Sequence, residues 1–237
     1  MKLLVIDTSN WPLGVAVLEN GVVLGEINSY ISKNHSLRLM PAIEQLFKEL
    51  NLKPAELDGI GVAQGPGSYT GVRIGVTTAK TLAWSLRVPL VGISSLQVIA
   101  QGAAGFPGVI VPMIDARRGQ VYRGCYRWDE EAGIVMEQEV DQLQLVSDMV
   151  EELKEKNTPI LFIGEGALAH QELVKECGLH AQLASGLQHK PRAAHLGLLA
   201  SYYWDSRAVK EIHAFAPEYL QLAEAEANWN AKQKGSC

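Results

Sequence analysis

The stretch VAQGPGSYTGVRIGVTTAK, residues 62–80, decides the fold, because it links an apolar strand to a long helix through a Gly-Pro-Gly turn. It looks like a nucleotide-binding loop but matches neither common pattern. The phosphate loop G-x-x-x-x-G-K-[ST] needs a lysine that the turn lacks, and G-x-G-x-x-G fails because Gly71 comes one residue late. The stretch predicts a strand over 59–63, a tight turn, and a helix over 70–86 capped by Ser68.

The same turn supplies candidates for an anion or nucleotide contact. Exposed backbone amides at the start of a helix attract anions, so Gly65, Gly67 and Ser68 are candidates. Asp7 ends the first predicted strand and is a fourth. No cofactor is expected, because the turn has no lysine for phosphates and the GEG of residues 164–166 adds an anionic side chain.

Composition indicates an ordinary globular protein, with 47% hydrophobic and 20% charged residues among 237. The net charge of −5 disfavours a chain that itself grips phosphates, so we expect any nucleic acid to be held by a partner. Cys125, Cys177 and Cys237 are too scattered for a disulfide framework. The first apolar run is too short for a signal peptide, which predicts a cytoplasmic protein without a membrane partner.

Hydrophobic periodicity gives the same order of elements twice. The first half is predicted to hold strands at 2–6, 14–18, 22–30, 59–63 and 90–93, with helices at 35–50 and 70–86. After a Gly-rich link at 101–108, strands at 109–114, 120–127, 134–140 and 160–163 follow, with a helix at 143–156. VIDTS and MIDAR stand at corresponding places, and ILFIGEGA resembles IGVAQGPGS.

This repeat predicts an α/β protein of two ribonuclease-H-like halves, each a mixed sheet with flanking helices and a cleft between them. The expected domains are residues 1–103 and 104–237, with the last helices packing back on the first half. Such a pair of halves is the architecture of actin, Hsp70 and the sugar kinases. The fold alone assigns no function.

Few residues match a catalytic pattern. Asp7 and Asp115 end matching strands, so they either hold a metal or water across the cleft or each cap the turn that follows. The six histidines lack the helical spacing of zinc ligands, and no serine or cysteine lies in a nucleophile motif. We therefore predict no catalytic residue and no metal site.

Arginines gather around one predicted strand. Arg123 and Arg127 alternate onto one face of the strand at 120–127, and with Arg117 and Arg118 they make a local basic patch. The patch either touches RNA or a partner's carboxylates, or it is a solvated face.

Two helices carry the predicted partner-binding surface. The helix at 35–50 has more apolar surface than one face needs, and the helix at 70–86 has small residues at successive i, i+4 positions. A glycine inside a helix costs about 1 kcal/mol relative to alanine, so close approach by another element should offset that cost. We expect a helix of a second molecule; the alternative is the sheet of the same domain. The assigned residues are His35, Leu39, Met40, Ile43, Gly71, Gly75, Ala79 and Ala83.

Six segments, in order along the chain, together resemble the TsaB (YeaZ) family: LVIDTS, HSLRLMPAI, GPGSYTGVRIGVTTAKTLA, VPLVGISSL, DARRGQVY and PEYL. The resemblance implies a non-catalytic, actin-like subunit of bacterial tRNA threonylcarbamoyladenosine biosynthesis. It implies pairing with the catalytic paralogue TsaD, and with the ATPase TsaE, to transfer threonylcarbamoyl to the adenosine beside the anticodon. It also implies a homodimer that competes with TsaD for the same surface.

Four positions depart from the pattern of this wider family. TsaD carries a metal-binding H-x-x-x-H where this chain has Ser95 and Ile99, and neither ligates a metal as imidazole does. Trp11 makes the first turn bulky, and Gln221 follows PEYL where arginine is common. Two other functions stay open: an ATP-dependent small-molecule kinase of this fold, and a metallopeptidase.

Overall fold

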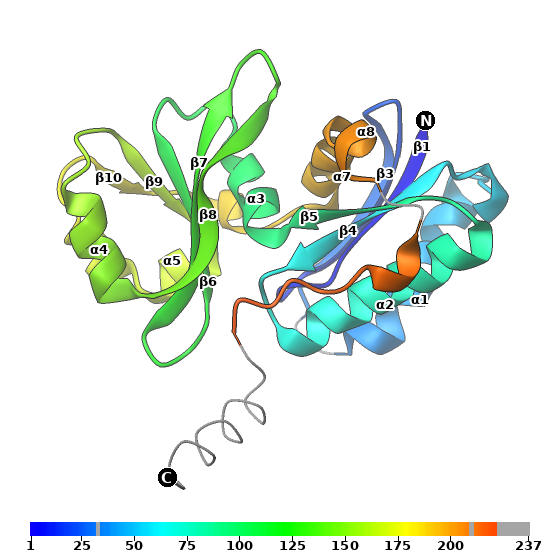
Figure 1. The fold of residues 1–237 in the computed structure, drawn as a ribbon, viewed down its shortest axis with the longest axis horizontal. Coiled ribbons are helices and arrows are strands. Elements are labelled where there is room, and N and C mark those ends of the chain that lie inside the picture. The colour runs from blue at the N-terminus through cyan, green and yellow to red at the C-terminus, as the bar shows by residue number, and fades with distance from the viewer. Residues whose placement is uncertain (32–33, 209–210, 222–237) are drawn as a thin grey trace, which may run out of the picture.

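The computed structural model describes residues 1–31, 34–208 and 211–221. Figure 1 shows two lobes side by side, each built on one five-stranded sheet. The first sheet contains β1 (Lys2–Asp7), β2 (Leu13–Glu19), β3 (Val22–Ser29), β4 (Gly59–Gly65) and β5 (Leu90–Ser94). The second contains β6 (Val109–Asp115), β7 (Gln120–Asp129), β8 (Ile134–Leu145), β9 (Ile160–Ile163) and β10 (Ala181–Leu183).

The two sheets have equivalent topology. The strand order is β3-β2-β1-β4-β5 in the first sheet and, from the corresponding edge, β8-β7-β6-β9-β10 in the second. In both, the first three strands are antiparallel and the fourth pairs in parallel with the first. The predicted repeat and fold class are therefore confirmed.

Eight α-helices among the described residues flank the sheets: α1 (His35–Glu49), α2 (Tyr69–Leu86), α3 (Ser95–Ala100), α4 (Val146–Lys154), α5 (Glu165–Ala169), α6 (Gln171–Lys175), α7 (Ala193–Tyr202) and α8 (Trp204–Arg207). None of the helices in this part of the chain is both long and apolar enough to cross a membrane.

The first sheet is covered on both faces, because both sets of its alternating side chains are apolar. Leu4 and Ile6 of β1 face α1 and α2, whereas Leu3 and Val5 face α7. This three-layer arrangement is visible in Figure 1, where α1 and α2 lie on one side of β1–β4 and α7 lies on the other.

Each lobe takes one helix from the other half of the sequence. α7 belongs to the second half but packs on β1 and β2, and α3 belongs to the first half but packs on β6 and β7. The contacts between elements therefore do not follow a sequence boundary at residues 103 and 104.

One predicted helix start is wrong. Residues 143–145 were expected to begin a helix but extend β8, where Leu143 pairs with Tyr122 and Leu145 with Gln120 of β7. The long β7 ladder supplies partners for these backbone groups, and α4 begins only at Val146.

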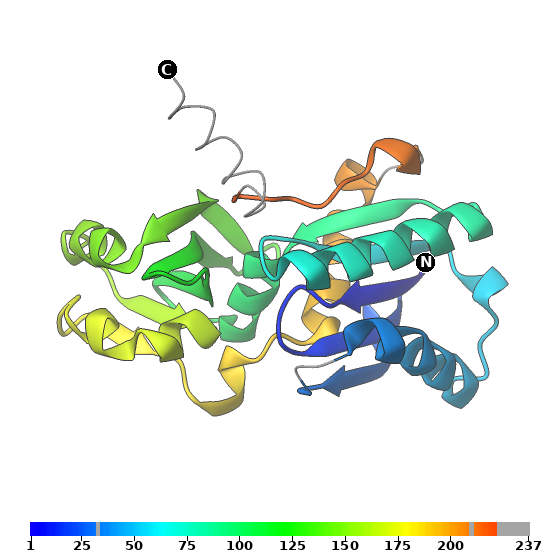
Figure 2. The same cartoon turned by 90° about the horizontal axis from the view of Figure 1, so that it is seen from below.

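Residues 211–221, here called the strap, begin with a short 3-10 turn, Ile212–Ala214, and then run in extended form along α2 towards the junction of the lobes (Figures 1 and 2). Ile212 is buried in the core beneath α2, and the partly buried Phe215 packs against the same cluster. The strap is the last part of the chain that the structure describes.

Candidate functional site

The Gly-Pro-Gly turn is locked to the turn that follows β1. The backbone N–H of Ser68 donates to the Ser9 carbonyl at 2.8 Å, and the Thr8 hydroxyl donates to the Gly71 carbonyl at 2.7 Å. Ser68 caps α2, since its Oγ accepts from the Gly71 N–H at 3.3 Å. The Ser68 amide of the predicted anion contact is thus already bonded to an oxygen of the protein itself.

Close packing explains two glycines of this turn. A Cβ at Gly67 would collide with the Ser9 carbonyl, and Gly65 has a φ of +119°, which favours glycine. The loop is therefore shaped by its contact with the β1–β2 turn.

The two aspartates that end β1 and β6 each bind their own following turn. Asp7 is buried and accepts from the Ser9 N–H at 2.9 Å and the Ser9 hydroxyl at 2.7 Å. Burial raises the pKa of Asp7 although these bonds oppose the shift. Asp115 accepts from the Arg117 N–H at 3.3 Å, and its Oδ1 lies 3.2 Å from Nε2 of His170. This is the turn-capping alternative of the two that the sequence left open.

The stripe of small residues on α2 faces its own sheet, which corrects the prediction that it meets a second molecule. The stripe residues Gly71, Gly75, Ala79 and Ala83 are all buried. A Cβ at Gly71 would collide with the Thr8 carbonyl, and one at Gly75 would lie 2.6 Å from the Thr8 hydroxyl oxygen. The glycines let the helix approach β1, and they leave no surface for a partner.

The predicted surface on α1 is likewise divided. Leu39 and Ile43 are buried in the core of their own lobe, so their assignment to a partner surface is corrected. Met40 is 48% exposed and Leu37 is 72% exposed. His35 begins the helix, with Nε2 3.0 Å from the Trp11 carbonyl oxygen.

A shallow groove of about 470 Å³ lies between α1 and the outer face of α2. Its lining residues are Ser36, Tyr69, Thr70, Arg73, Ile74, Thr77 and Thr78. The Arg73 guanidinium carbon lies 5.2 Å from the centroid of the Tyr69 ring, and its Nη1 donates to the Tyr69 hydroxyl at 2.9 Å. The groove thus presents a cation held by an aromatic ring.

The positions expected for metal-binding histidines are part of the core. Ser95 and Ile99 lie one turn apart on α3 and both are buried, with Ile99 in the cluster that packs against β6 and β7. The described residues contain no group of three or more His, Cys, Asp or Glu side chains that could hold a metal ion.

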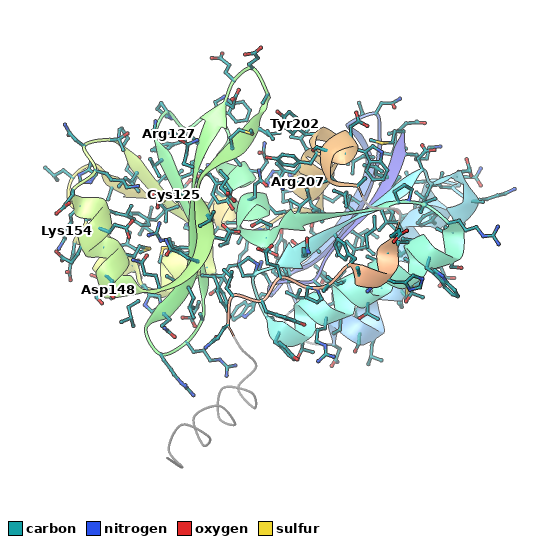
Figure 3. All side chains as sticks on the ribbon, viewed as in Figure 1. Cys125, Arg127, Asp148, Lys154, Tyr202 and Arg207 are labelled. Atoms are coloured by element: carbon teal, nitrogen blue, oxygen red, sulfur yellow. The ribbon has the colours of Figure 1, made fainter. Side chains whose placement is uncertain are left out.

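The predicted basic patch divides into buried and exposed residues. Arg123 is fully buried, so contact with RNA, contact with a partner's carboxylates and a solvated face are all wrong for its side chain. Its Nη1 lies 2.6 Å from Oε2 of Glu139, and its Nη2 lies 2.7 Å from Oε2 of Glu152. Arg127, at the far end of the same strand, is exposed (Figure 3).

Arg117 and Arg118 stay on the surface at the turn between β6 and β7. Both are exposed and have positive φ, 66° and 55°, which is uncommon for residues other than glycine. They are the arginines of the DARRGQVY segment, and for them the alternatives of RNA contact, contact with a partner's carboxylates and a solvated face stay open.

These features define a two-lobed α/β protein of the ribonuclease-H-like, actin-type fold. A family model described as "TsaD: tRNA N6-adenosine threonylcarbamoyltransferase" matches residues 24–229. The protein TsaB of Bacillus subtilis is 43% identical over 99% of this chain and 100% of its own length. TsaB of Escherichia coli is 31% identical over 93% of this chain and 95% of its own.

A solved structure, YeaZ from Pseudomonas aeruginosa, superposes with a TM-score of 0.79 at 28% identity, and covers 92% of this chain and 99% of that one. The chain belongs to the TsaB group of the TsaD-type family, and the predicted resemblance is confirmed. Its family places it in tRNA threonylcarbamoyladenosine biosynthesis.

Two features of the structure were not predicted from the sequence. The strap is bonded to α2 and β4, a contact that the PEYL segment alone does not indicate. Ser94, at the end of β5, donates to Asp141 of β8 and so joins the two lobes. The sequence signal for the strap is a glycine in a strand: Gly92 of β5 has no side chain, and this leaves room for Phe215 of the strap.

Proposed function

We propose that this chain is a non-catalytic subunit that binds a TsaD-type catalytic paralogue in a complex that also includes a TsaE-type ATPase. The observation that supports this most directly concerns the positions where the resemblance leads us to expect the metal-binding histidines of TsaD. In this chain these positions are Ser95 and Ile99, and both are buried in the core. A hydroxyl and a hydrocarbon side chain do not replace two imidazoles. On this proposal tRNA is held mainly by the partner.

The partner-binding face consists of the outer sides of α1 and α2. Met40 and Leu37 expose apolar side chains there, and the groove lined by Arg73 and Thr77 lies beside them. Apolar residues next to a well-placed arginine are typical of protein interfaces. The same face serves a homodimer, so self-association and TsaD binding exclude each other.

Size-exclusion chromatography of the chain mixed with a purified TsaD protein, such as that of Bacillus subtilis, tests the partnership. We expect the homodimer peak to be replaced by one of the mixed complex. Separate elution at concentrations of tens of micromolar would contradict the proposal. Formation of threonylcarbamoyladenosine by the purified chain alone, from threonylcarbamoyl-adenylate and tRNA, would contradict its non-catalytic part.

A further inference from the structure

The strap is held to α2 by a lysine on the helix. The Lys80 ammonium donates to the carbonyl oxygens of His213 at 3.1 Å and Phe215 at 2.5 Å. α8 ends at Arg207, six residues before His213, and Ile212 anchors the strap in the core. A charged donor on two backbone acceptors makes this a specific contact.

The strap is also bonded to the end of β4. The Gln64 side-chain amide donates to the Ala216 carbonyl at 2.8 Å, and the Glu218 N–H donates to the Gln64 carbonyl at 2.9 Å. Two glycines leave room for it. A Cβ at Gly65 would collide with the Glu218 carbonyl, and a Cβ at Gly92 would collide with the Gln64 side chain and lie 2.7 Å from the Phe215 ring.

The end of the strap reaches the groove on α2. The Tyr219 ring stacks on the Tyr69 ring with 5.0 Å between centroids and 30° between planes. The Tyr69 ring in turn contacts the Arg73 guanidinium. Tyr69 and Arg73 both line the groove, whereas Tyr219 does not line it. Two residues further on, Gln221 accepts from the Tyr122 hydroxyl of the other lobe at 3.2 Å.

We propose that the strap is a positioning element for the partner-binding face, which holds Tyr219 against Tyr69 and so fixes Tyr69 and Arg73 in the orientation that a TsaD-type partner or a second copy of this chain meets. The inference rests on the proposed function of the α1–α2 face. A free Tyr69 would gain rotamer freedom that the partner must remove on binding. Docking the strap therefore lowers the entropic cost of partner binding.

Gly92→Ala tests this from a distance, because Gly92 lies on β5 and is not among the residues lining the groove. The added methyl displaces the Gln64 side chain, which holds the strap, and the Phe215 ring of the strap itself. We expect faster amide exchange at residues 215–221 and 71–74. The Kd for TsaD and for the homodimer should rise about two- to tenfold, the value of one aromatic pair. Gly61→Ala is the matched control, since its methyl meets Val5 and Ala200 on the face that α7 covers.

A second variant, Tyr219→Ala, removes the stack whether or not the strap is released, and the same weakening is expected. Unchanged affinity for TsaD and for a second copy in Tyr219→Ala would overturn the proposal. The proposal would also be overturned if Gly92→Ala speeds amide exchange in the strap but leaves the Kd for both partners unchanged. If the wild-type chain binds neither partner, the proposed function fails. In that case amide exchange still tests the strap. Faster amide exchange at residues 71–74 in Gly92→Ala would support the proposal that the strap positions this part of α2, and unchanged amide exchange there would refute that proposal.

Discussion

The guanidinium of Arg123 lies 2.6 Å from the carboxylate of Glu139, with the arginine side chain fully buried and the glutamate partly exposed. Glu139 also binds Lys156, and Glu152 binds the second arm of the guanidinium. Although burial alone would raise the pKa of Glu139, Lys156 and Arg123 lower it to about 2. This network joins β7, β8 and α4, so it stabilises the C-terminal lobe.

Replacing Arg123 by methionine should lower the free energy of unfolding. The substitution keeps much of the apolar stem but leaves Glu139 without its arginine partner. Loss of one member of a buried ion pair costs about 3–5 kcal/mol, and partial exposure of both glutamates reduces this to about 2–3 kcal/mol. Urea denaturation at pH 7 measures the change. Arg127→Met, at the exposed end of the same strand, should change stability by less than about 0.5 kcal/mol.

The sequence predicted features that depend on neighbouring residues, and it did not predict contacts between residues far apart in the chain. Alternation and helical periodicity are local, and they predicted β1 to β9, α1, α2 and the repeat, but not the short edge strand β10. Spacing along α2 correctly grouped Gly71, Gly75, Ala79 and Ala83, but it cannot tell which surface the group meets. The structure places that group against β1 and β4.

Long-range partners limited the other predictions. The sequence could not show that Arg123 is buried, because its two carboxylate partners lie 16 and 29 residues away. The strap meets Gln64, which precedes Ala216 by 152 positions in the chain. No periodicity encodes such a contact. Family segments such as PEYL marked the position without explaining it.

The buried carboxyl group between the lobes should make stability depend on pH. Asp141 accepts from the Tyr126 hydroxyl at 2.6 Å and from Ser94, and burial raises its pKa from 3.8 to about 6, with Glu137 and Glu218 adding to the shift. A raised native-state pKa means that the folded protein binds the proton more tightly than the unfolded chain. The contribution of Asp141 therefore favours folding at low pH and is lost as pH rises from about 4 to about 6.

Asp141→Asn removes this contribution, because the amide cannot ionise. We expect the stability difference between variant and wild type to shift in favour of the variant as pH rises from 4 to 7, and to level off above 7. Denaturant unfolding at intervals of half a pH unit measures the difference. A stability difference that stays constant over this pH range would contradict the raised pKa of Asp141. Asp148→Asn, on the exposed surface of α4, serves as the control (Figure 3).

Ala79→Leu should destabilise the N-terminal lobe rather than break an interface. Ala79 is fully buried against the sheet, so three extra carbon atoms overpack the core at a cost of about 1–3 kcal/mol. We expect an earlier thermal transition, with partner binding retained below it. Thr81→Leu, on the exposed side of α2, should melt close to wild type. A variant at Ala79 that melts normally yet elutes as a monomer would restore the interface interpretation of the stripe.

Thr77→Arg tests the partner-binding face directly. Thr77 is exposed, lines the groove and lies one helical turn after Arg73, so the new guanidinium fills the groove and repels the existing one. We expect the Kd for TsaD and for the homodimer to rise on the order of tenfold or more, as for residues in the centre of an interface. The melting temperature should stay within about 2 °C of wild type, because the substitution is on the surface. Gln138→Arg adds the same charge on β8 of the other lobe and should leave both affinities unchanged. If Thr77→Arg binds both partners as wild type does, the outer face of α2 is not where they meet, and the proposed face must be abandoned.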